Sequence, residues 1–283
     1  MNGHPSRPDP TADPTTVADP TTVAVEAALS TLAAVAPPTL RPAVLVETGL
    51  ADRYAVLDSP IGPLVVAWNG LGVSTVDLAG DAAAFEARHL ALTGRPAFAA
   101  ASVPERLAGA IARRLGGDRR VRIDLDLRGH SPFEQDVWRK ALEIPRGEVR
   151  PYGWVAAEIG RPRAVRAVGT ALGHNPVPLI VPCHRVVRTD GSIGQYSLGG
   201  PGNKRTILAT EGLDPEAMEA AARRGERLVG CASTRIVCWP SCRTERHMLE
   251  RNRRPFRSLA DAAAAGYRPC KVCRPVATIV SAA

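Results

Sequence analysis

Four cysteines near the C-terminus restrict the fold of this chain more than any other feature of its sequence. They come in two pairs, CWPSC at 238–242 and CKVC at 270–273, with 27 residues between the pairs. Two short loops of this kind are typical of a tetrahedral zinc site with four thiolate ligands. A domain this small has a modest core, so the metal is expected to hold it folded. The sequence therefore predicts one structural Zn²⁺ bound by four side chains, Cys238, Cys242, Cys270 and Cys273.

The positive charge of the chain is concentrated in the same region. Residues 216–283 carry 13 basic and 6 acidic side chains, and the whole chain has a net charge of +8. A small basic domain indicates a polyanionic partner, with nucleic acid as the first candidate. A GC-rich genome would explain the preference for arginine over lysine, but it would not explain the excess of positive charge.

The sequence favours an intracellular location. No apolar run approaches the ~20 residues of a membrane span, and the opening MNGHPSRPDP lacks the regions of a secretory signal. We expect a reducing cytoplasm and no contact with a membrane. In that compartment six cysteines favour metal binding or catalysis over disulfides.

Two segments of different character precede the helical part of the chain. Residues 1–22 are rich in Pro, Thr and Asp, and DPTTVA at 13–18 is repeated at 19–24; residues 1–50 are predicted to form a disordered tail. Residues 51–128 are predicted to form a small α/β or α+β unit, with Asn69-Gly70 as a hairpin turn. Its expected elements are β-type runs in RYAVLDS, PLVVAW, LGVSTVDL and VRIDLDL (121–127), and helices over 82–92 and 104–115.

Residues 129–215 are predicted to be rich in helix. SPFEQDVWRKAL begins with a capping box, in which Ser131 is the N-cap and Glu134 stands three residues later. YGWVAAEIG and AVRAVGTALGHN follow with helix-turn-helix spacing. This spacing is compatible with DNA binding and also with ordinary helix packing.

The stretch NPVPLIVPCHRVV, at 175–187, places a thiol next to an imidazole among prolines. Prolines remove donors from a β-ladder, so this is not a core strand. Consecutive side chains do not face each other on a helix or strand. If Cys183 and His184 act together, the chain must turn there or a water must link them. The dipeptide alone is equally compatible with a buried, inert cysteine.

The wider stretch closely resembles the active-site region of the O6-alkylguanine-DNA alkyltransferases. The resemblance runs from about Arg53 to Gly212 and includes PYG, RAVGTALGHNP and GSIGQYSLGG in order. It implies an α+β / α/β chain, with a ribonuclease-H-like N-terminal half and a helical half that holds the DNA and the thiol.

The resemblance also implies roles for individual residues. Cys183 matches the nucleophile that attacks the alkyl carbon on guanine O6. His184 accepts the thiol proton through a water, and Glu211 orients the imidazole. Tyr152 matches the tyrosine that delivers a proton to guanine N3, and Asn175 matches the asparagine that braces the site.

Further residues are expected to contact the DNA and the base. Arg166 matches the arginine that fills the gap left by the extruded guanine, which must leave the stack to be reached. Ala167 and Gly169 lie on the same helix and would allow close approach of its backbone. Tyr196 and Ser197 lie in a segment that resembles the base-binding loop of the family.

These roles imply a single-turnover enzyme, a methylated-DNA–[protein]-cysteine S-methyltransferase. Its partner would be double-stranded DNA containing O6-alkylguanine, and the protein would be a monomer. We expect no cofactor for the transfer to Cys183, so chelation should leave guanine repair largely intact. Two other classes remain open, a Cys-His-Glu hydrolase and a zinc-containing DNA-binding protein in which Cys183 is inert.

Residues 226–283 resemble the zinc domain of the bacterial adaptive-response (Ada) proteins, especially in IVCWPSCR and AAGYRPCKVCRP. In those proteins the first zinc-bound cysteine also accepts methyl groups from DNA methylphosphotriesters, and Cys238 matches it. Trp239 stands where a basic residue is common, and the domain follows the alkyltransferase region here instead of preceding it. The alternative is a structural zinc module that assists DNA binding.

Overall fold

The computed structural model describes residues 40–276, and the chain from Pro42 onward belongs to one compact unit. Of the tail predicted over residues 1–50, residues 1–39 lie outside the described residues. Within the described part, every helix is too short or too polar to cross a bilayer.

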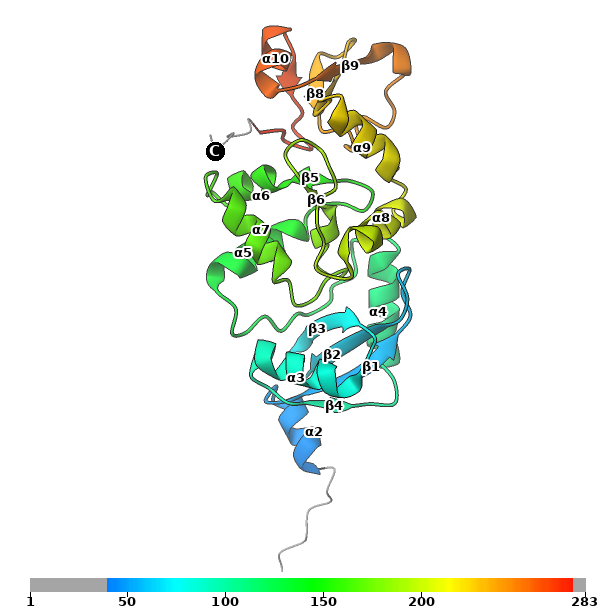
Figure 1. Ribbon diagram of the computed structural model, residues 1–283, viewed down its shortest axis with the longest axis vertical. Helices are drawn as coiled ribbons and strands as arrows, with labels where there is room; N and C mark the ends of the chain where they lie inside the picture. Colours follow the sequence, from blue (N-terminus) through cyan, green and yellow to red (C-terminus); the bar gives the residue numbers. More distant parts are fainter. Residues whose placement is uncertain (1–39, 277–283) are drawn as a thin grey trace, which may run out of the picture. The chain divides into compact units, whose positions relative to one another are not determined.

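The N-terminal half contains a four-stranded sheet with the order β3-β2-β1-β4 (Figure 1). The first three strands are antiparallel neighbours, and β4 runs parallel to β1. The Asn69-Gly70 turn joins β2 to β3, which confirms the predicted hairpin. The elements are β1 (Asp52–Leu57), β2 (Leu64–Asn69), β3 (Gly72–Leu78), α3 (Ala82–Thr93), β4 (Ala97–Ala99) and α4 (Glu105–Leu115).

Order begins before the predicted boundary at residue 50. Helix α2 covers Leu40–Glu47, and Val46 in its last turn is buried. The amide of Gly70 donates to the carbonyl of Val46 at 3.0 Å, and Arg128 Nη2 donates to the carbonyl of Gly49 at 2.6 Å. These long-range contacts attach the segment to the sheet, and local composition could not predict them.

The segment VRIDLDL is extended but does not form the predicted strand. Only Leu125 pairs with the sheet, opposite Val73. Gly72 explains the close approach, because a Cβ there would lie 2.3 Å from the carbonyl oxygen of Asp124. The alternation in the sequence correctly indicates one packed face, since Ile123, Leu125 and Leu127 contact the main hydrophobic core.

The central part is helical and begins with the predicted capping box at Ser131 and Glu134. Trp138 is fully buried, and its indole nitrogen donates to the carbonyl of Ala171 at 2.8 Å, which joins α5 to α7. The elements are α5 (Pro132–Ala141), β5 (Arg150–Pro151), α6 (Tyr152–Glu158), α7 (Val165–Gly173), η1 (Cys183–Arg185), β6 (Val186–Val187) and α8 (Gly200–Thr210). Strands β5 and β6 pair in parallel.

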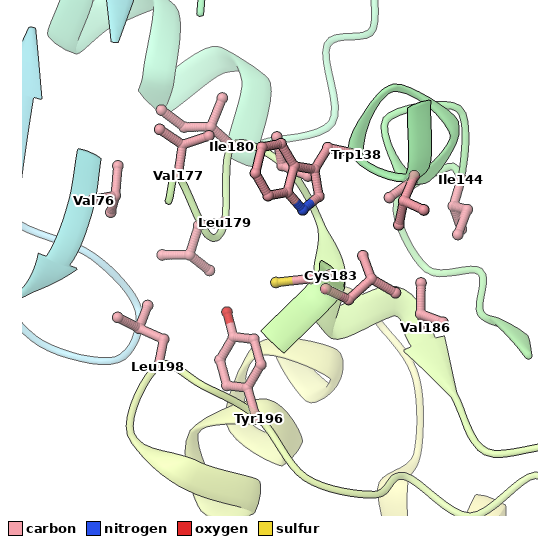
Figure 2. Packing of buried hydrophobic residues seen from close by; sticks show 14 of the residues in the cluster. Val76, Trp138, Ile144, Val177, Leu179, Ile180, Cys183, Val186, Tyr196 and Leu198 are labelled. Atoms are coloured by element: carbon pink, nitrogen blue, oxygen red, sulfur yellow. The ribbon is translucent and has the colours of Figure 1, made fainter. Parts of the chain in front are cut away.

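The hydrophobic core extends to the thiol of Cys183. Figure 2 shows Cys183 in one hydrophobic cluster with Val76 of the sheet, Trp138 of α5 and the loop residues Val177, Leu179 and Ile180. Leu179 has a φ of +70°, a region that non-glycine residues rarely adopt. Its burial in this core stabilises the strained loop that leads to Cys183.

The C-terminal part has its own small sheet, with the order β10-β8-β7-β9. A separate apolar cluster surrounds the four cysteines and includes Val229, Val237, Trp239 and Tyr267. The elements are α9 (Pro215–Arg223), β7 (Leu228–Cys231), β8 (Ile236–Cys238), η2 (Glu250–Asn252), β9 (Arg253–Phe256), α10 (Leu259–Ala264) and β10 (Arg268–Pro269).

Candidate active site and metal centre

Cys183 and His184 lie in a turn, as the sequence requires if they are to act together. Pro182 precedes the short 3₁₀ helix η1, and its carbonyl accepts a hydrogen bond from the amide of Arg185 at 2.9 Å. Cys183 is 5% exposed and His184 is 1% exposed. Within this turn the two side chains have different hydrogen-bond partners, Asn175 for Cys183 and Glu211 for His184.

Asn175 holds the thiol of Cys183. Its Nδ2 donates to Sγ at 3.0 Å and to the carbonyl of Val181 at 3.0 Å. Its Oδ1 accepts from the amide of Val177 at 3.1 Å, so the amide group is fixed on both sides. Burial raises the pKa of the Cys183 thiol, and the Asn175 hydrogen bond and the positive charge of Lys204 offset part of that rise. The thiol is therefore protonated at neutral pH and needs a base to become a nucleophile.

Glu211 connects His184 to Arg185. His184 Nε2 lies 3.0 Å from Glu211 Oε1. Arg185 Nε donates to both carboxylate oxygens at 3.1 and 3.0 Å, and its Nη2 donates to Oε1 at 2.6 Å. Burial alone would raise the pKa of Glu211, but the hydrogen bonds from His184 and Arg185 outweigh it and lower the pKa to about 2. The carboxylate is thus charged at every physiological pH.

The imidazole of His184 is in the right state to accept a proton. Burial lowers its pKa, and the hydrogen bond to Glu211 counteracts only part of that effect. Because Nε2 faces the Glu211 carboxylate, Nε2 carries the proton in the neutral ring. Nδ1 is buried and has no hydrogen-bond partner among the described residues, so it is the available acceptor.

Two tyrosines lie near the thiol. Figure 2 shows the Tyr196 hydroxyl and the Cys183 sulfur pointing into the same region, beside Leu179 and Leu198. Burial raises the pKa of both Tyr152 and Tyr196, and a negative charge on Cys183 would raise them further. Both hydroxyls therefore stay protonated and can donate hydrogen bonds.

Four of the five residues expected to contact the DNA or the base occupy exposed or half-exposed positions, whereas Tyr196 is buried. Arg166 and Ala167 are exposed on α7, and Gly169 lies one turn from Arg166 on the same helix. A Cβ at Gly169 would be 4.0 Å from the ring of Tyr152, so α7 and this tyrosine are neighbours. Ser197 is exposed, and it lines a cleft of about 460 Å³ together with Asn175.

The sequence reasoning missed two charged residues in the site. Arg185 anchors Glu211, and Lys204 of α8 is buried with its Nζ donating to the carbonyl of Val186 at 2.7 Å. Burial lowers the pKa of Lys204 to about 8. The sequence does contain one indication for Lys204: the chain has only three lysines among its 36 basic residues, so a lysine at this position stands out.

The four cysteines of the predicted metal site lie together. Their sulfurs are all within 4.8 Å of one another, and all four residues are buried. A tetrahedral ion with Zn–S bonds of about 2.3 Å separates its sulfurs by about 3.8 Å, so the donors fit zinc. The amide of Trp239 donates to Cys273 Sγ and that of Val272 to Cys270 Sγ, both at 3.4 Å, as suits thiolate ligands. Cys231 and His247 are not part of this cluster.

Comparison with known proteins agrees with both sites. The family model for the DNA binding domain of 6-O-methylguanine DNA methyltransferase matches residues 132–213, and that for the metal binding domain of Ada matches residues 217–276. The methylated-DNA–protein-cysteine methyltransferase of Mycobacterium tuberculosis is 40% identical over 159 residues, which are 56% of this chain and 92% of that protein. The mouse protein of that name is 35% identical over 172 residues, 57% of this chain and 82% of its own length.

Part of the chain is also similar in sequence to proteins of solved structure. Mycobacterium tuberculosis OGT in complex with DNA is 34% identical, with a TM-score of 0.43, over 56% of this chain and 93% of that chain. A methyltransferase from Pyrococcus kodakaraensis is 26% identical, with a TM-score of 0.44, over 57% of this chain and 99% of that chain. Because it covers nearly all of relatives to which it is 40% identical, the chain belongs to the family of methylated-DNA–protein-cysteine methyltransferases.

Proposed function

We propose that this protein transfers the alkyl group of O6-alkylguanine in DNA to Sγ of Cys183. One observation carries the proposal: a buried thiol held by Asn175 lies in the same turn as an imidazole that Glu211 orients. The methyltransferase name of relatives at 35–40% identity supports this assignment.

The geometry suggests how the thiol is activated. The Cys183 proton moves to Nδ1 of His184 through a water, and Glu211 stabilises the resulting imidazolium. Arg185 keeps Glu211 in place through its paired hydrogen bonds. Lys204 contributes a buried positive charge that favours the thiolate.

The thiolate then displaces the purine. Sγ attacks the alkyl carbon, the bond between that carbon and O6 breaks, and its electron pair stays with guanine. Tyr152, whose hydroxyl is kept protonated by burial, donates a proton to N3 so that guanine leaves as a neutral base. The product is a thioether on Cys183, and among residues 40–276 no group in the site is placed to cleave it. Each protein molecule therefore acts once.

Recognition of the lesion is proposed for the exposed face of α7. Helices α6 and α7 would act as a helix-turn-helix, with the N-terminal half, residues 51–128, as a ribonuclease-H-like domain beside the active domain, residues 129–215. Arg166 would fill the gap in the duplex, while Ala167 and Gly169 allow close approach. Tyr196 and Ser197 would line the place of the extruded base.

The C-terminal residues 226–283 are proposed to bind one Zn²⁺ through the four clustered cysteines. The ion would supply folding free energy to a module with a small core. The basic surface of that module, which includes Arg251 and Arg254, would contact phosphates. Cys238 is 2% exposed, within the range of 0–4% that the four cysteines span, so burial does not distinguish it as an acceptor. Methyl transfer from phosphotriesters to Cys238 stays a prediction.

Incubation with duplex DNA that carries labelled O6-methylguanine tests the proposal. We expect one label per chain on a cysteine and no further turnover. A Cys-His-Glu hydrolase would transfer no label and would instead turn over esters. A DNA-binding protein with an inert Cys183 would bind the duplex without transfer. The monomeric state and the cytoplasmic location also remain predictions.

A further inference from the structure

Residues 147–149 lie between the metal-binding cysteines and the Cys183 site. The segment precedes β5 and is buried throughout. On one side it contacts the loop around Cys242, and on the other it contacts Glu211. Residues 241–246 and Glu211 are far from residues 147–149 in the sequence, but in the fold they contact these three consecutive positions.

The loop around Cys242 contacts all three positions. Ser241 Oγ accepts from the amide of Val149 at 2.8 Å and lies 3.2 Å from the carbonyl of the same residue. The amide of Arg243 donates to Glu148 Oε1 at 3.3 Å. Arg246 Nη2 donates to the carbonyl of Gly147 at 2.5 Å. Ser241 and Arg243 flank the ligand Cys242 directly, so the metal-binding loop itself forms this interface.

Gly147 transmits the contact to the active site. Its amide donates to Glu211 Oε2 at 3.2 Å, while its carbonyl accepts from Arg246. Its φ is +70°, and a Cβ there would lie 2.6 Å from Arg246 Nη2 and 2.8 Å from the Glu211 carbonyl. Only glycine fits in this position between the two residues. The position of Glu211 Oε2, the oxygen that does not contact His184, therefore depends partly on the C-terminal module.

We propose that Arg246 and Ser241 are positioning residues for alkyl transfer to Cys183, and that a metal-loaded Cys242 loop is needed to hold them. The inference rests on the proposed function and revises one expectation from the sequence, that guanine repair is independent of the metal. Fixing residues 147–149 fixes one hydrogen bond to Glu211, and Glu211 orients the imidazole that accepts the thiol proton. The metal takes no part in the chemistry and acts only through this chain of contacts.

The test measures single-turnover transfer from an O6-alkylguanine free base, so that altered DNA binding cannot affect the rate. We compare the zinc-loaded full chain, the chelated chain and Arg246→Ala. Chelation and Arg246→Ala should each remove the net contribution of about one hydrogen bond. The rate constant of transfer should therefore be about 3- to 10-fold lower after either of them. In the chelated Arg246→Ala protein the two effects should not multiply, because both release the same segment. Active-site titration separates a slower rate from a smaller active fraction.

Controls distinguish positioning from general destabilisation. Arg246→Lys keeps a donor for the Gly147 carbonyl and should restore much of the rate. Arg257→Ala removes an exposed arginine of the same module that makes no hydrogen bond to residues 147–149, and it should leave the rate unchanged. Ser241→Ala, checked for zinc content, should slow transfer like Arg246→Ala.

Hydrogen exchange gives a readout that does not depend on activity. Chelation should speed exchange of the Gly147 and Val149 amides, because their partners Glu211 and Ser241 are released or displaced. Unchanged protection there, or an unchanged rate constant after chelation, would overturn the coupling. If the zinc-loaded chain transfers no alkyl group, the proposed function fails, and the exchange measurement still decides whether the two sites are linked.

Discussion

Replacing Glu211 with glutamine should destabilise the protein by about 3 kcal/mol at neutral pH. The carboxylate is buried and holds Arg185 and His184, and its pKa is about 2 compared with the ordinary 4.5. At about 1.4 kcal/mol per pH unit, this difference corresponds to about 3 kcal/mol. Breaking a buried ion pair by removing one partner costs a similar amount, since Arg185 would remain buried without a counter-charge.

The sign of the pH dependence follows from the lowered pKa. The contribution of Glu211 is complete above about pH 4.5 and is lost as the pH falls through about 2. Urea unfolding of the wild type and Glu211→Gln should therefore differ most at pH 7 and converge toward pH 2. Glu226→Gln is a matched control, because Glu226 forms a similar paired contact with Arg224 at the surface and should matter little. An equal loss of stability at pH 7 and pH 3 would refute this reasoning.

The same substitution should also impair the chemistry. A glutamine amide can donate to Nε2 of His184, which would place the ring proton on Nδ1. That nitrogen could then no longer accept the thiol proton, and the rate should fall by roughly 10³- to 10⁴-fold, as when a carboxylate that orients a catalytic histidine is replaced by its amide. A loss below tenfold in single-turnover transfer would mean that Glu211 does not set the tautomer.

Three further substitutions test other parts of the account. Asn175→Ala removes the donor to Cys183 Sγ, so the pKa of the thiol should rise. Transfer should slow by about 10–100-fold, which corresponds to the free energy of a hydrogen bond to a charged group. Alkylation of Cys183 by iodoacetamide as a function of pH measures the pKa shift. Arg166→Ala should slow repair of duplex DNA more than transfer from the free base, and equal slowing of both would exclude it as the residue that fills the stack. Asp52→Asn removes the buried negative charge that pairs with Arg95 and should lower the unfolding free energy by about 3 kcal/mol, which urea titration would detect.

Local sequence signals predicted the elements that depend on local interactions. The Asn69-Gly70 turn and the capping box at Ser131 are formed as expected, since each needs residues within a few positions. Helix α2 was missed because long-range contacts with Gly70 and Arg128 hold its end. VRIDLDL shows the limit of periodicity: alternation reports a packed face, but a ladder also needs a neighbouring strand along its whole length.

The candidate site was predictable to a similar extent. Spacing alone selected the four cysteines that cluster, and resemblance to a known family selected Cys183, His184 and Glu211. Arg185 and Lys204 were not predicted, because a buried charge is recognisable only when its partners and burial are known. The contacts of residues 241–246 with residues 147–149 span more than 90 positions, and no sequence pattern reports them.

The most direct test of the central claim is mass spectrometry of peptides from the full chain after incubation with duplex DNA containing O6-methylguanine. The account predicts one added methyl group on the peptide that contains Cys183, a stoichiometry that saturates at one per chain, and none in Cys183→Ala. Methyl groups found only on another residue, or repeated demethylation of DNA by one protein molecule, would contradict it.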